Sequence, residues 1–145
     1  MNYEFEHSIE CPVSKDFAWR FWSDIENWIV VDSSVEWVKL EGDFIVGTKG
    51  FTKPRGAEPA EWELLEVEDG KSAVIGIFLP GAVLKFHWNF ADSSSTDGVL
   101  ISQRVTLTGE QTENYAEGME FLKKEMPQGM QNLVKGMIKA AGSDA

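Results

Sequence analysis

The 145-residue sequence has little of several features that would each point to a particular class of protein. It contains one cysteine, Cys11, so no disulfide can form within the chain. It has 13 lysines and arginines and 24 acidic residues, and the resulting net charge of -11 disfavours nucleic acid and anionic membranes as partners. No apolar run reaches the roughly 18 residues of a membrane-spanning helix. The opening residues lack the basic and apolar regions of a signal peptide. We therefore expect a cytoplasmic protein without stable membrane insertion.

Motifs that carry chemistry are equally scarce. The two histidines, His7 and His87, form no metal-ligand spacing with Cys11, and strand alternation places them on opposite faces. We find no nucleophile motif, no phosphate-binding glycine loop and no convincing pair of catalytic carboxylates. No metal and no cofactor are expected. The length suits one domain that covers residues 1–145.

The longest periodic stretch is residues 112–141, which we predict to be a major helix. Pro127 lies inside it, and two interpretations are open: one long helix that bends there, which would make its first half a movable lip, or two helices that meet there. The apolar stripe on one face recurs at helical spacing and contains four methionines, which adapt to an irregular or partly filled space. Its members are Tyr115, Met119, Leu122, Met126, Met130, Leu133 and Met137.

Most of the remaining chain is predicted to form short antiparallel strands. Residues 3–10 alternate between apolar and acidic side chains, as in a half-buried strand. Ser14 is a plausible N-cap for a short helix over residues 15–22, and a second short helix follows through Ile25 and Trp28. Leu64 and Leu65 in succession suggest a bulge. Turn residues separate six further strands, at 35–40, 48–53, 60–67, 72–79, 83–91 and 99–108.

This order of elements predicts an α+β fold in which a seven-stranded curved antiparallel sheet wraps around the last helix. A further set of residues, most of them near the start of the chain, has the spacing of a known family: Phe5, Ser8, Ile9, Cys11, Pro12, Val13, Asp16, Phe17, Ala18, Trp19, Ser23, Asp24, Asn27, Trp28, Gly42, Gly47, Thr48, Leu133, Val134 and Lys135. On these residues and the order of elements, the chain resembles the helix-grip fold of the START-like (SRPBCC, birch-pollen-allergen-like) superfamily and, within it, the polyketide cyclase/dehydrase and lipid transport family. The resemblance implies a deep apolar cavity under the last helix, and it brings no shared catalytic residues.

Two polar residues fall on strand faces predicted to point inward. Gln103 shares its face with Ile101 and Val105, so its amide must bond either to neighbours or to a ligand. His7 lies among inward apolar residues, where a histidine either bonds to a backbone carbonyl or serves as a general base. His7 is therefore a weak catalytic candidate.

The six tryptophans suit either a filled core or the wall of an apolar cavity with a few polar anchors. Trp28 and Trp88 are our preferred cavity residues. The family resemblance would place Arg55 at the cavity mouth, where a guanidinium can hold a ligand carboxylate or simply be solvated. The predicted ligand-binding set is Trp28, Arg55, Trp62, Phe86, Trp88, Gln103, Met119, Met126 and Met130.

Three functions are compatible with this sequence. The preferred one is a carrier or sensor that binds one apolar small molecule, such as a lipid, a polyketide or an aromatic compound. The second is a cyclase or dehydratase acting in the same cavity, with His7 as base and Gln103 or Arg55 holding the carbonyl. The third is an interaction module whose groove accepts a partner helix or a second copy of the chain, so a homodimer is possible.

Overall fold

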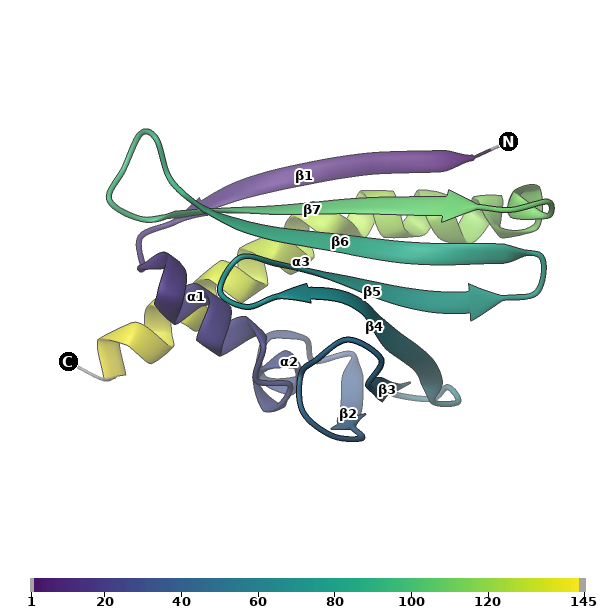
Figure 1. The fold of residues 1–145 in the computed structure, drawn as a ribbon, viewed down its shortest axis with the longest axis horizontal. Helices are drawn as coiled ribbons and strands as arrows, with labels where there is room; N and C mark the ends of the chain where they lie inside the picture. Colours follow the sequence, from purple (N-terminus) through teal and green to yellow (C-terminus); the bar gives the residue numbers. More distant parts are fainter. Residues whose placement is uncertain (1, 144–145) are drawn as a thin grey trace.

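A computed structural model describes residues 2–143 and contains one sheet of seven strands in the order β1-β7-β6-β5-β4-β3-β2. Every neighbouring pair is antiparallel, and the last helix lies across one face of the sheet (Figure 1). The α+β helix-grip architecture expected from the sequence is confirmed. The strands are β1 Tyr3–Cys11, β2 Val35–Leu40, β3 Lys49–Pro54, β4 Ala60–Glu68, β5 Ser72–Leu79, β6 Ala82–Asp92 and β7 Val99–Thr108.

Two short helices, α1 (Lys15–Trp22) and α2 (Glu26–Val31), join β1 to β2. Ser14 caps α1 as expected, because its hydroxyl accepts a hydrogen bond from the backbone N–H of Phe17 at 3.0 Å. The sequence predicts a buried side made of Phe17, Ala18, Phe21 and Trp22. In the structure the buried side also includes Trp19, which is 4% exposed. Its indole N–H donates to Asp69 at 3.0 Å, which ties α1 to the turn between β4 and β5.

The C-terminal helix α3 runs from Ala116 to Ser143 without a break at Pro127. The interpretation as two helices is therefore wrong, because neighbouring turns and packing keep the helix continuous across the missing N–H. The first residues of the predicted helix differ too, since Thr112–Tyr115 form a 3-10 turn, η1. The predicted apolar stripe does face the sheet, with Met119, Met130 and Met137 each at most 3% exposed.

Strands β4 and β5 are paired along only part of their lengths. The bulge predicted at the two leucines is present, since the register shifts between Leu64 and Glu66. Pairing ends at Glu63 opposite Gly76, and beyond this point the two strands diverge. Residues 60–62 of β4 pair with β3 alone, and residues 77–79 of β5 pair with β6 alone. The sheet thus contains a gap.

The core consists of two apolar clusters between the sheet and α3. The larger one gathers around α1 and the C-terminal half of α3, where Trp19, Phe90 and Met137 are buried. The smaller one lies near the start of α3 and includes Leu84, Leu107 and Met119. Phe86 and Met126 pack against both clusters. Among residues 2–143, no helix is long and apolar enough to cross a membrane.

Candidate functional site

The middle of the concave sheet face is less buried than either end. On β6, Leu84 and Phe90 are buried, whereas Phe86 and Trp88 between them are only half-buried. The pattern repeats on β7, where Gln103 is half-buried between the fully buried Ile101 and Val105. Inward-facing residues of one strand differ this way only where the covering layer is incomplete. The middle of the concave face, between the two apolar clusters, is therefore covered less completely than its ends.

The last helix shows the same change in burial. Leu122 and Met126 on α3 are half-buried, whereas Met119 and Met130 on either side are 3% and 1% exposed. Of the three methionines predicted to bind a ligand, Met119 and Met130 are buried in the two apolar clusters, while Met126 lies between them and packs against both. Phe86 on the sheet also packs against both clusters.

The strand register brings three polar side chains into one row across the middle of the concave face. His7 on β1 pairs with Gln103 on β7, and Gln103 pairs on its other side with Trp88 on β6. Directly paired residues have Cβ atoms roughly 5 Å apart on one face of a sheet. His7 is half-buried, on the same face of β1 as Phe5 and Ile9, so the prediction that it points inward is confirmed.

The polar atoms of these three side chains make no hydrogen bond within the described part of the chain. Among the described residues, the imidazole of His7, the amide of Gln103 and the indole N–H of Trp88 have no hydrogen-bond partner. Their polar atoms are also not sealed from solvent. A half-buried polar group without a protein partner must bond to water or to a bound molecule. This row is therefore available to a ligand.

A chain of aromatic rings in tilted contact extends from Trp88 toward β4. Trp22 on α1 lies 5.2 Å from Trp88 and 5.9 Å from Trp28, and Trp28 lies 5.3 Å from Trp62, measured between ring centroids. The indole N–H of Trp28 donates to the carbonyl of Trp22, and that of Trp62 donates to the Thr52 hydroxyl. The indole N–H groups of the predicted residues Trp28 and Trp62 are thus both hydrogen-bonded within the protein. Trp22, which sequence reasoning left out of the site, is the ring that joins them to Trp88.

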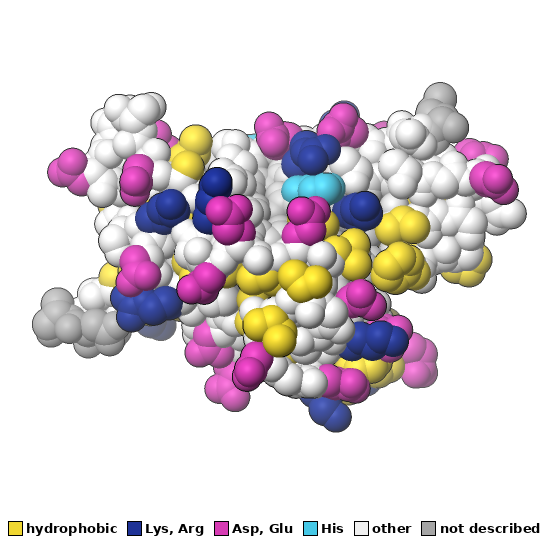
Figure 2. Space-filling model, viewed as in Figure 1, with side chains coloured by type: hydrophobic (Ala, Val, Ile, Leu, Met, Phe, Trp, Pro, Cys, Tyr) yellow, Lys and Arg dark blue, Asp and Glu magenta, His cyan; other side chains and the backbone are white. Residues whose placement is uncertain are grey.

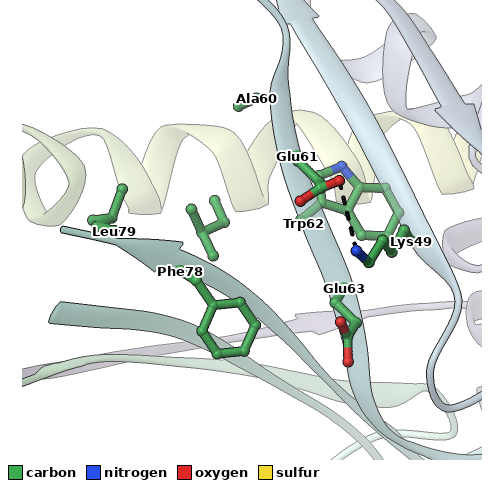
Figure 3. A pocket seen from close by; sticks show the side chains of 8 residues that line it. Lys49, Ala60, Glu61, Trp62, Glu63, Phe78 and Leu79 are labelled. Atoms are coloured by element: carbon green, nitrogen blue, oxygen red, sulfur yellow. Dashed lines mark ion pairs between the residues drawn. The ribbon is translucent and has the colours of Figure 1, made fainter.

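A pocket of about 280 Å³ occupies the gap between β4 and β5. Figure 3 shows Phe78 and Leu79 on one side and Glu61, Trp62 and Glu63 on the other, with the ion pair of Lys49 and Glu61 at 4.0 Å. Inward-facing and outward-facing residues both line this pocket. Trp62 lines it and also belongs to the chain of aromatic rings.

Arg55 does not join the other predicted residues. It follows β3, its Nε donates to the carbonyl of Ser33 at 3.0 Å, and its backbone N–H donates to that of Ser34 at 2.9 Å. The side chain is exposed and holds the loop between α2 and β2. A role for Arg55 in ligand binding stays a prediction.

The other histidine lies on the outer face of the sheet, as alternation predicts. His87 bonds to the Thr106 hydroxyl at 3.2 Å and to Arg104 at 3.4 Å, and Arg104 pairs with Glu4 at 2.7 Å. Figure 2 shows a histidine among charged side chains on this face. Burial, followed by the positive charges of Arg104 and Lys85, lowers the pKa of His87 from its ordinary value of 6.5. No group of three His, Cys, Asp or Glu side chains that could hold a metal occurs within residues 2–143.

Solved structures share this fold at low sequence identity. Ara h 8.0201 matches with a TM-score of 0.77 and 13% identity over 96% of this chain and 99% of its own. The di-domain ARO/CYC StfQ from the steffimycin biosynthetic pathway matches with a TM-score of 0.74 and 16% identity, over 98% of this chain and 53% of its own. Norcoclaurine synthase from Thalictrum flavum, in complex with dopamine and hydroxybenzaldehyde, matches with a TM-score of 0.69 and 13% identity, over 100% of this chain and 89% of its own.

At these identities the likeness concerns the fold. It confirms the helix-grip fold that the sequence predicts. Neither a scan against protein-family models nor a search of curated proteins finds a match. The narrower resemblance to the polyketide cyclase/dehydrase and lipid transport family therefore stays a prediction.

Proposed function

We propose that this protein is a carrier or sensor that binds one apolar small molecule in a hollow between the middle of the concave sheet face and α3. The observation that carries the proposal is the loss of burial at Phe86, Trp88, Gln103 and Met126, between residues that are fully buried. In a core filled by its own side chains, inward positions in the middle of a sheet are the most buried, not the least.

The similar structures support this proposal through what their names state. One is a norcoclaurine synthase in complex with dopamine and hydroxybenzaldehyde, and another is an ARO/CYC protein of a biosynthetic pathway. Both place the same architecture alongside ring-containing small molecules or their synthesis. A cytoplasmic location, one domain and the absence of nucleic-acid partners remain expectations from the sequence.

Filling the hollow tests the proposal. We expect N-phenyl-1-naphthylamine, a neutral apolar probe, to bind the native chain and to gain fluorescence. Met126→Trp places a larger side chain in the hollow and should weaken probe binding by at least about tenfold, roughly 1.4 kcal/mol. Phe121→Trp is the matched control, because Phe121 is 63% exposed on the same helix. Equal probe binding by both variants, or none by the native chain, would overturn the proposal.

The second candidate is an enzyme acting on the bound molecule, and the pairing of His7 with Gln103 favours it. A neutral imidazole can accept a proton while an amide N–H holds a carbonyl oxygen. The two functions separate in an assay for conversion of the bound molecule. A carrier releases its ligand unchanged, whereas an enzyme converts it, and the His7→Gln variant of an enzyme still binds its substrate and no longer converts it.

A further inference from the structure

We propose that His7, Gln103 and Trp88 form one polar subsite that selects an uncharged ligand carrying a carbonyl or hydroxyl group, over both a pure hydrocarbon and a carboxylate. This inference rests on the proposed binding function and specifies its ligand. It starts from the row that strand register forms across β1, β7 and β6. The polar atoms of its three side chains have no hydrogen-bond partner within the described chain.

The hydrogen-bonding capacity of the row suits an oxygen that both accepts and donates. The Gln103 amide offers an N–H donor and a carbonyl acceptor, a neutral His7 offers one of each, and the Trp88 indole offers a donor alone. A carbonyl oxygen accepts from the amide or the indole. A hydroxyl accepts in the same way and also donates to the imidazole or the amide oxygen. A hydrocarbon would displace water from these groups without replacing its hydrogen bonds.

The inward sheet positions near the row contain no charge that would attract an ion. Among the inward positions of β1, β5, β6 and β7 the only Lys, Arg, Asp or Glu is Asp92, which is exposed at the end of β6, and the other polar residues, tryptophan and tyrosine apart, are His7 and Gln103. Phe86 and Met126 are apolar and pack against the same cluster as Trp88. A carboxylate placed there would lose its hydration without gaining a counter-ion. The chain's net charge of -11 opposes an anion further.

Three probes of one shape separate these contributions: naphthalene, 2-naphthol and 2-naphthoate. We expect the native chain to bind 2-naphthol at least about tenfold more tightly than naphthalene, and 2-naphthoate most weakly, in equilibrium titrations at neutral pH. Equal affinities for naphthalene and 2-naphthol would overturn the inference and leave the proposed function intact. If none of the three probes binds, the proposed function fails, and the inference fails with it.

Gln103→Met removes the central polar group while keeping the length of the side chain. We expect this variant to bind naphthalene as the native chain does and to lose most of its preference for 2-naphthol. The matched control is Ser102→Ala on the same strand, because Ser102 faces outward and bonds to Ser8 at 2.8 Å. A preference for 2-naphthol that survives in Gln103→Met would exclude Gln103 from the subsite.

The native chain gives an independent readout, should the variant fold poorly. Its two histidines produce two sets of imidazole signals in nitrogen-resolved NMR spectra, and His87→Gln identifies which set belongs to His7. We expect 2-naphthol to shift the ring-nitrogen signals of His7 and leave those of His87 in place, with a much smaller effect from naphthalene. Equal shifts from both compounds would show that His7 senses occupancy alone and would overturn its part in the subsite.

Discussion

Trp62 can lie against the sheet only because residue 50, its partner on β3, has no side chain. A Cβ at Gly50 would overlap the indole ring, which Trp28 and the hydroxyl of Thr52 hold from other directions. The ring therefore has no room to move away. The backbone conformation of Gly50 is one that any residue can adopt. Glycine is therefore required here by the close approach of the Trp62 ring and not by the backbone angles.

We expect Gly50→Ala to lower the free energy of unfolding by about 1–3 kcal/mol, the usual cost of forcing extra volume into a packed site. Gly118→Ala is the control, because a Cβ there meets no atom within 4 Å. In the helix, that change should stabilise the protein by up to about 1 kcal/mol. Urea unfolding of both variants tests this, and an unchanged stability of Gly50→Ala would mean that the Trp62 ring does not occupy this position.

His87 should make stability depend on pH. Because its pKa is lowered in the folded protein, the unfolded chain takes up the proton first as the pH falls through 6.5. The stabilising contribution of neutral His87 is therefore complete above pH 6.5 and is lost progressively below it. The side chain is partly exposed, so we expect an effect of only about a few tenths of a kcal/mol.

Urea unfolding of native protein and His87→Gln between about pH 5.5 and 7.5 measures this contribution. The native protein should lose more stability than the variant toward the acidic end. Parallel curves would show that Arg104 and burial do not disfavour the charged imidazole.

The sequence was most informative about single residues inside regular strands. Strict alternation was enough to place Gln103 and His7 inside and His87 outside, because a strand has only two faces. It was less informative for helix α1, where Trp19 is buried by contacts with Phe44 and Phe90, which come from distant parts of the chain. Alternation also could not show that His7 and Gln103 are neighbours, since that depends on the pairing of β1 with β7.

At the level of elements, Pro127 shows the limit of local rules. A proline in a helix removes one backbone hydrogen bond, which locally favours a break. The apolar residues on both sides of it nevertheless pack against a single sheet, and α3 continues through it. Burial of one long apolar stripe outweighs the loss of one hydrogen bond. Such a balance depends on tertiary packing and cannot be derived from the segment alone.

The gap between β4 and β5 gives a testable contrast between adjacent amides. The Leu64 N–H donates to the carbonyl of Thr48, the residue before β3, at 2.9 Å. Amides alternate in direction along a strand, so Trp62 N–H points to β3 and Glu61 N–H points into the gap. We expect Glu61 to exchange its amide hydrogen at least about tenfold faster than Trp62. Hydrogen exchange followed by NMR measures both, and equal protection would mean that the gap is closed in solution.

At the scale of the whole molecule, the sequence predicted the order of elements and the architecture because turns and alternating strands are locally encoded. It could not decide whether the tryptophans and phenylalanines fill the interior. In the structure Trp19, Trp22 and Trp62 are buried in contact with other aromatic rings, whereas Phe86 and Trp88 are left half-buried. The division depends on how far α3 covers the sheet, which no local pattern reports.

Native mass spectrometry of the full chain purified from its source tests the central claim most directly. The account predicts a complex of one chain with one neutral apolar compound, released on denaturation and carrying a carbonyl or hydroxyl oxygen. The mass of the empty chain alone, both as purified and after incubation with N-phenyl-1-naphthylamine, would contradict it and would mean that the hollow holds only water.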